Sequence, residues 1–158
     1  MFIPMIKDTM VDVFLGNWHI GGKEKHMAFF KQVLQKRDME VLEDFLKMNH
    51  IDKKRNGSTL LHTAAFEDDL PFVTLLLQKG ANINAQDKEG RTPLAIASYF
   101  IFETMVEHLL KKGADPLIRD EEGKTARHRA MNGWKGVVHG KVARIITEKE
   151  AKQRRFLI

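Results

Sequence analysis

The chain has 158 residues, of which 43% are hydrophobic and 30% are charged, a balance that is typical of one soluble globular domain and excludes a disordered chain. It contains no cysteine, which excludes disulfides, thiolate metal sites and cysteine nucleophiles. The net charge of +5 is unevenly distributed: residues 119–158 hold 11 Lys and Arg but 5 Asp and Glu, whereas the rest of the chain is nearly neutral.

The first 24 residues are apolar but do not resemble a targeting signal. Their apolar run is interrupted by Pro4, Lys7, Asp8 and Asp12, and it lacks a basic start and a small-residue cleavage site. No stretch of the chain approaches the roughly 20 apolar residues of a membrane-spanning helix. We therefore expect a cytoplasmic protein without membrane contact. Residues 1–24 are an N-terminal extension that either folds back onto the next segment or mediates self-association; we expect a monomer.

Residues 25–53 carry two helical patterns. The second places apolar side chains at Val41, Leu42, Phe45 and Leu46, a spacing that suits one face of a helix. We expect a degenerate pair of helices that caps the N-terminal end of the segments that follow.

A 33-residue period begins after this cap. Glycines recur at positions 57, 90 and 123, and threonines at 59, 92 and 125. Residues 54–86 and 87–119 are two copies in register, and each contains the sequence L-L-x-x-G-A near its end. The second copy opens with D-x-x-G-x-T-P-L at Asp87–Leu94. A fixed period of this length predicts stacked units that bury their apolar faces against each other.

This period and its T-P-L-H motif resemble the ankyrin repeat. The first copy keeps His62 but has Leu60 at the proline position, and the second keeps Pro93 but has Ala95 at the histidine position. The resemblance implies an all-α solenoid of stacked helix-turn-helix units with hairpin-like fingers. It also implies a non-enzymatic protein-binding module.

The residues at the motif positions favour the same local structure. Thr59 and Thr92 are suited to cap the start of a helix, and Pro93 suits the first helical position. Gly80 and Gly113 suit the left-handed position after a helix end. The second helix of each unit has an apolar face, formed by Phe72, Val73, Leu75, Leu76 and Leu77 in the first and by Met105, Val106, Leu109 and Leu110 in the second.

Residues 120–158 keep the opening motif as far as Thr125, but Ala126–Arg129 departs from P-L-H-x. A second helix needs about three extra residues before Val142, and it ends in a charged segment at 148–155. We expect a C-terminal capping repeat with a polar outer face and a basic tail.

The resemblance implies that a protein partner contacts variable positions of the fingers and first helices on the concave face. These are Arg55, Asn56, Ser58, Phe66 and Glu67, then Lys88, Glu89, Arg91, Tyr99 and Phe100, then Glu121, Glu122, Lys124, Asn132 and Trp134. Large exposed aromatics are frequent binding anchors, but Ile101 and Phe102 adjoin two of them, so the alternative is that the cluster fills a turn. The charged finger residues either steer a partner or are simply solvated. They are Lys53, Lys54 and Arg55, then Asp87, Lys88, Glu89 and Arg91, then Asp120, Glu121, Glu122 and Lys124.

The chain shows no motif for catalysis or metal binding. Its seven histidines lack metal-ligand spacing, and His62 is expected to order its turn by hydrogen bonding. Nucleophile-elbow, P-loop and dinucleotide-binding motifs are absent. We expect no enzyme activity, cofactor or metal.

Three functions stay open. The first is an adaptor or scaffold, and the second is an immunity-type inhibitor that blocks a partner enzyme. The third is nucleic-acid-associated binding through the basic C-terminus, where salt-dependent contacts to phosphates are expected; a solubilising cap or an acidic protein partner would explain the same charge. The basic residues concerned are Arg127, Arg129, Lys135, Lys141, Arg144, Lys149, Lys152, Arg154 and Arg155, interrupted by Glu148 and Glu150.

Overall fold

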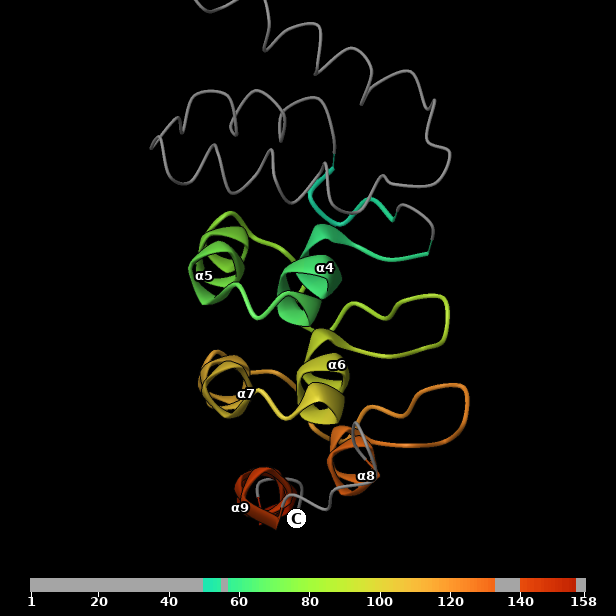
Figure 1. Cartoon of the computed structure of the whole chain (residues 1–158), viewed down its shortest axis with the longest axis vertical. Coiled ribbons are helices and arrows are strands. Elements are labelled where there is room, and N and C mark those ends of the chain that lie inside the picture. Colours follow the sequence, from blue (N-terminus) through green and yellow to red (C-terminus); the bar gives the residue numbers. More distant parts are fainter. Residues whose placement is uncertain (1–49, 55–56, 133–139, 156–158) are drawn as a thin grey trace, which may run out of the picture. The chain divides into compact units, whose positions relative to one another are not determined.

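The computed structural model describes residues 50–54, 57–132 and 140–155 (Figure 1). All of them belong to one compact unit, Asn49–Ile158. The predictions for residues 1–24 and for the helices of 25–49 lie outside the described residues. The described part contains α4 (Leu60–Phe66), α5 (Leu70–Gln78), α6 (Pro93–Phe100), α7 (Glu103–Lys111), α8 (Ala126–Met131) and α9 (Gly140–Arg155). Among these helices, none is long and apolar enough to cross a membrane.

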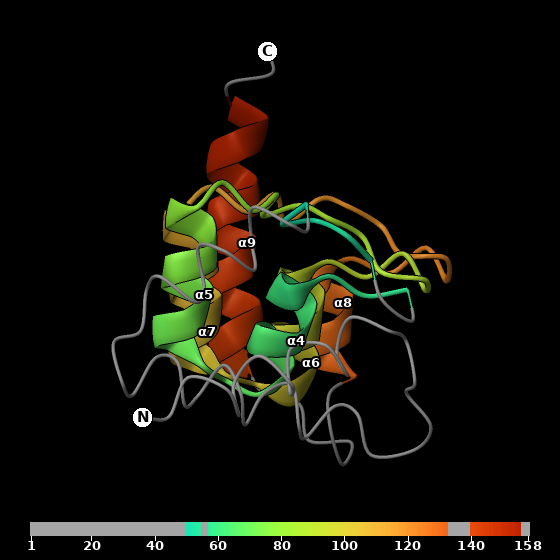
Figure 2. The same cartoon turned by 90° about the horizontal axis from the view of Figure 1, so that it is seen from above.

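The helices form two rows. α4, α6 and α8 lie one after another in the first row, and α5, α7 and α9 form the second (Figure 1). Contacts join each helix of the first row to the next, and join the two helices of each pair. The segments between pairs extend as fingers to the side of the first row (Figure 2). This arrangement confirms the predicted all-α repeat solenoid.

Each helix of the first row begins at a threonine. Thr59, Thr92 and Thr125 are N-caps with extended backbone. The Thr92 hydroxyl accepts a hydrogen bond from the Ala95 N–H at 3.2 Å, which satisfies one of the donors left free at a helix start. Pro93 is the first residue of α6. The predicted starts at Thr59 and Thr92 are therefore confirmed.

The helices of the second row end as the glycines predict. Gly80 and Gly113 follow the C-caps of α5 and α7 and have φ of +88° and +97°. The next amide, that of Ala81 or Ala114, donates to a carbonyl of the last helical turn at 3.0 Å. These bonds satisfy carbonyls that would otherwise lack partners at the helix end.

The core lies between the two rows. Ala64, Ala97 and Ala130 occupy the same repeat position in α4, α6 and α8, and all three are completely buried. Their small side chains let neighbouring helices approach closely. The second row supplies most of the large side chains with no exposed surface: Phe72, Val73, Leu76, Met105, Val106, Leu109, Val142 and Ile146. Leu94 of α6 is the one from the first row among the described residues. Burial of one such side chain stabilises the fold by about 1.5–3 kcal/mol.

The last unit departs from the others in its second helix. α9 has 16 residues, whereas α5 and α7 have nine each. Its C-terminal turns extend past the rest of the second row on the side of the fingers (Figure 2). Val142 and Ile146 anchor its first half in the core. Its second half contains the buried Glu150 and also Gln153, whose Nε2 donates to Asp115 at 3.1 Å.

Candidate functional site

The finger turns are held by buried carboxylates. Oδ1 of Asp87 accepts hydrogen bonds from the N–H groups of Glu89 at 2.9 Å and Arg91 at 2.8 Å. Burial alone would raise the pKa of Asp87, but hydrogen bonds from Arg91 and Glu89 hold it below its usual value. Asp120 makes the equivalent bonds one period later. These two residues therefore order the turns, which corrects their grouping with the solvated or partner-steering finger charges.

Neighbouring fingers are bonded to each other through their backbones. The Glu121 N–H donates to the Glu89 carbonyl at 3.1 Å. The Gln86 side chain bridges two fingers, because its Nε2 donates to the Gly90 carbonyl at 2.7 Å and to the Arg119 carbonyl at 3.1 Å. These bonds fix the fingers as a rigid array.

The predicted contact residues of the second finger differ in availability. Nη2 of Arg91 forms ion pairs with Asp87, at 2.7 Å, and with Glu89. Nζ of Lys88 lies 3.6 Å from Glu89, yet the Lys88 side chain is 65% exposed. Of the two cations in the second finger, Lys88 is therefore the more accessible to a partner, because the Arg91 guanidinium is paired with carboxylates of its own turn.

The last finger is an ion-pair network. Oε1 of Glu122 accepts from Arg129 and Oε2 from Lys124, each at 2.7 Å, and these bonds lower the pKa of Glu122 to about 2. Nε of Arg129 also donates to Asp120 at 2.7 Å. Counting Arg129 among the free basic residues is therefore wrong, because its side chain is only 14% exposed and faces two carboxylates. Glu121 stays exposed.

Aromatic side chains of two adjacent units form one cluster. The Phe100 ring meets Phe66 and Tyr99 edge-on, with centroids 5.1 Å apart in both pairs, and stacks on Phe102 at 5.8 Å. Ile101 has φ of +64° in the turn between α6 and α7. Phe102 is not one of the predicted contact residues, although it lies two positions after Phe100 in the sequence. Phe66 is 48% exposed, so the cluster both packs the turn and presents a ring to solvent.

The other predicted contact residues are scattered. Ser58 is half-buried, Glu67 is exposed beside Phe66, and Asn132 is exposed at the end of α8, where its side chain donates to the His128 carbonyl at 3.3 Å. Arg55, Asn56 and Trp134 lie outside the described residues.

His62 has the structural role that its motif predicts. Nδ1 lies 2.8 Å from the Thr59 hydroxyl, and Nε2 lies 2.9 Å from the Arg91 carbonyl in the next unit. Burial lowers the pKa of His62, which favours the neutral ring. His128 makes the same 2.8 Å contact to Thr125. The expected departure at 126–129 is therefore only partial: the T-x-x-H spacing at 125–128 equals that at 59–62 and could have revealed it.

The basic C-terminal residues are only partly free. Nζ of Lys141 bonds to Glu103 at 2.5 Å, which raises the pKa of Lys141. Nε of Arg127 lies 3.8 Å from Glu150. Lys135 lies outside the described residues. Among the described basic residues of this set, the remaining exposed cations lie on α9: Arg144, Lys152, Arg154 and Arg155. Free positive charge in the described part of the last unit is therefore concentrated on one helix.

Comparisons with known proteins place the repeats in a family. A model of ankyrin repeats matches three copies at residues 25–120. The chain is 51% identical over 43 residues to the ADP-ribosylation factor GTPase-activating protein AGD1 of Arabidopsis thaliana, a match that covers 27% of this chain and 5% of that protein. It is 50% identical over 46 residues to human Rabankyrin-5, covering 29% of this chain and 4% of that protein.

A third relative extends the match. The chain is 38% identical over 66 residues to the potassium channel AKT1 of Oryza sativa subsp. indica, covering 40% of this chain and 7% of that protein. The chain thus spans less than a tenth of the length of these three relatives, and the likeness concerns repeat segments alone. Because the matched repeats cover more than half of the chain, the chain belongs to the ankyrin-repeat family.

Proposed function

We propose that this chain is an adaptor that binds a protein partner through the face formed by its fingers and first-row helices. Ankyrin repeats imply a protein–protein interaction module, and the family is generally non-enzymatic. The observation that carries the proposal is the aromatic cluster, Phe66, Tyr99, Phe100 and Phe102, because it spans two units and leaves Phe66 half exposed. Exposed aromatics held in place by neighbours are typical of binding hot spots.

The cluster is organised before a partner arrives. Edge-to-face contacts with Phe100 orient both Phe66 and Tyr99, and such pairs add about 0.5–1.5 kcal/mol beyond area burial. A ring that is already ordered loses little side-chain entropy on binding. We therefore expect rigid recognition, with little change in the backbone.

The fingers supply the polar part of the same interaction. Hydrogen bonds to Asp87 and Asp120 and between neighbouring fingers fix their turns. The exposed side chains of the fingers therefore extend from a rigid backbone. Lys88 and Glu121 are exposed and of opposite charge. Exposed charges of this kind set partner choice and association rate more than affinity.

The test is capture of a partner from the native lysate by the full chain. The double variant Phe66→Ala/Tyr99→Ala is expected to bind the captured protein at least about tenfold more weakly, since a hot-spot aromatic contributes about 2 kcal/mol. Thr104→Ala is the control, because Thr104 is exposed but lies on α7, a second-row helix outside the proposed face. Circular dichroism and thermal unfolding establish that each variant folds.

The outcomes test the aromatic binding face and distinguish an adaptor from an inhibitor. Equal capture by wild type and the double variant would overturn the aromatic face as the binding site. If the captured partner is an enzyme, its assay with added chain separates the two roles: unchanged turnover supports the adaptor, and stoichiometric loss of turnover supports the immunity-type inhibitor instead.

A further inference from the structure

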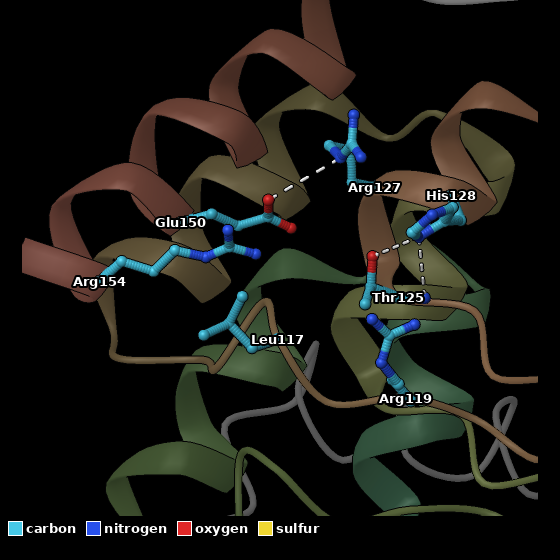
Figure 3. A pocket seen from close by; sticks show the side chains of 7 residues that line it. All are labelled: Leu117, Arg119, Thr125, Arg127, His128, Glu150 and Arg154. Atoms are coloured by element: carbon cyan, nitrogen blue, oxygen red, sulfur yellow. Dashed lines mark hydrogen bonds and ion pairs between the residues drawn. The ribbon is translucent and has the colours of Figure 1, made fainter. Parts of the chain in front are cut away.

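A pocket of about 450 Å³ lies at the C-terminal end of the stack, between α8, α9 and the finger segment before Asp120. Arg119 and Leu117 line it from the finger, Arg127 and His128 from α8, and Glu150 and Arg154 from the extended part of α9 (Figure 3). Figure 3 shows the side chains of Glu150 and Arg154 reaching from α9 towards α8. The pocket is separate from the aromatic cluster, which joins α4 and α6.

Arg119 reaches the pocket because the repeat pattern ends there. One period earlier, Gln86 donates both to the Gly90 carbonyl of its own finger and to a carbonyl of the next finger. Nη1 of Arg119 makes the first of these bonds, to the Gly123 carbonyl at 2.6 Å. No further finger follows among the described residues, so the other guanidinium donors of Arg119 are left for another acceptor.

His128 likewise lacks a bond to a following unit among the described residues. In the first unit, Nε2 of His62 bonds to the next unit, at the Arg91 carbonyl. His128 repeats the contact of its Nδ1 with Thr125, but its Nε2 has no partner within the described part of the chain. Two residues that line the pocket, Arg119 and His128, thus occupy positions whose equivalents, Gln86 and His62, bond to the following unit.

The charge of the pocket selects an acidic ligand. Three guanidinium groups, those of Arg119, Arg127 and Arg154, face one carboxylate, that of Glu150. Glu150 is only 9% exposed, and its sole ion pair among the described residues is the 3.8 Å contact with Arg127, which is too long for a direct hydrogen bond. Arg154 makes no hydrogen bond or ion pair with any described residue. The excess of cations therefore lies inside the pocket.

We propose that this pocket binds an acidic segment of a protein, with Asp or Glu side chains received by Arg119 and Arg154. A guanidinium group binds a carboxylate through two parallel hydrogen bonds. The volume of about 450 Å³ suits more than a single small anion, and Leu117 offers an apolar wall for the methylene groups of a peptide. This second site is independent of the proposed aromatic face.

The experiment measures binding of fluorescein-labelled hexaglutamate to the full chain by fluorescence polarisation, at about 20 mM and about 150 mM salt. Arg154→Gln is expected to weaken binding about tenfold, because it removes a charge-assisted bidentate contact. Arg155→Gln is the matched control: it makes the same charge change at an exposed neighbour that does not line the pocket, and it is expected to weaken binding less than about twofold.

A substitution at Glu150 tests the proposal through an expected gain in affinity for hexaglutamate. Glu150→Gln keeps the shape of the side chain and removes a like charge, so hexaglutamate is expected to bind several-fold more tightly. Glu148→Gln, at an exposed position of the same helix outside the pocket, is expected to leave binding unchanged. Phe66→Ala is expected to bind hexaglutamate like wild type, so failure of this proposal is distinguishable from failure of the aromatic face.

Four results would overturn the proposal. They are absence of hexaglutamate binding at low salt, equal losses in Arg154→Gln and Arg155→Gln, competition by inorganic phosphate at the concentration at which unlabelled peptide competes, and preferential binding of a thymidine oligonucleotide that Arg154→Gln abolishes. The last would assign the pocket to nucleic acid.

Discussion

At the scale of single residues, His62 joins two units. Its Nδ1 accepts from the Thr59 N–H at 3.3 Å, which leaves the proton on Nε2, and Nε2 then donates to the Arg91 carbonyl at 2.9 Å. One buried ring thus caps the start of α4 and also bonds to the next finger. His128 performs the first task but not the second, so the two histidines form a natural comparison.

His62→Ala is expected to lower the free energy of unfolding by about 2–3 kcal/mol, because it removes a cap, the bond from Nε2 to the Arg91 carbonyl and the volume of a buried ring. His128→Ala is expected to cost about 1 kcal/mol, since only the cap is lost. Urea unfolding of both variants measures the difference. Equal losses would contradict the role of His62 between units.

The same ring makes stability depend on pH. Burial lowers the pKa of folded His62 below the ordinary value of 6.5, so the unfolded chain takes up a proton before the folded chain does. The stabilisation is complete above pH 6.5 and is lost as the pH falls towards the folded pKa. The stability difference between wild type and His62→Ala is therefore expected to shrink from about pH 7 to about pH 5.5. A difference that urea unfolding finds constant over this interval would refute it.

At the scale of elements, the fingers depend on close backbone contact. Gly90 and Gly123 occupy equivalent turns and both have φ of +73°. A Cβ on Gly90 would lie 2.9 Å from the backbone N of Glu121 in the next finger, whereas a Cβ on Gly123 would meet nothing within 4 Å. A side chain at either position would therefore strain the backbone equally. The positions differ because, among the described residues, another finger follows Gly90 but not Gly123.

Gly123→Ala is expected to destabilise the fold by about 1–2 kcal/mol, which is the cost of left-handed backbone for alanine. Gly90→Ala is expected to cost at least about 1 kcal/mol more, because the neighbouring finger has to move. Thermal and urea unfolding of the two variants give this difference. Indistinguishable variants would show that the fingers do not pack against each other in solution.

Sequence patterns predicted the elements whose causes are local. Thr92 and Gly80 mark a helix start and a helix end because capping depends on a few neighbouring residues. The surroundings of Arg129 were not predictable from a charge count, because its two carboxylate partners are placed by the finger and α8 together. Arg119 and Arg154 meet in one pocket only because α9 is longer than the other second-row helices, and no motif records that length.

At the scale of the described unit, the main helix contacts lie within a repeat or join neighbouring repeats. α9 contacts α7 and α8, and Ile146 is completely buried in that contact. Stability in such a stack is approximately a sum of unit and nearest-neighbour contributions. A defect at one end should therefore act mainly at that end.

Ile146→Ala is expected to lower stability by about 2–5 kcal/mol through the cavity it leaves. Amide hydrogen exchange is expected to accelerate strongly in α7, α8 and α9, and less in α4 and α5. Exchange mass spectrometry resolves these segments. Uniform acceleration across all of them would mean that the stack unfolds as a single cooperative unit.

Several of the side-chain bonds that link one unit to the next end on backbone atoms. His62 and Gln86 donate to carbonyls of the following unit, and Oδ1 of Asn84 accepts from the Asp115 N–H. A backbone acceptor or donor is present whatever side chain stands at that position. These particular bonds thus do not depend on the side chain at the position that they reach, so exposed side chains can diverge towards new partners while these bonds stay intact.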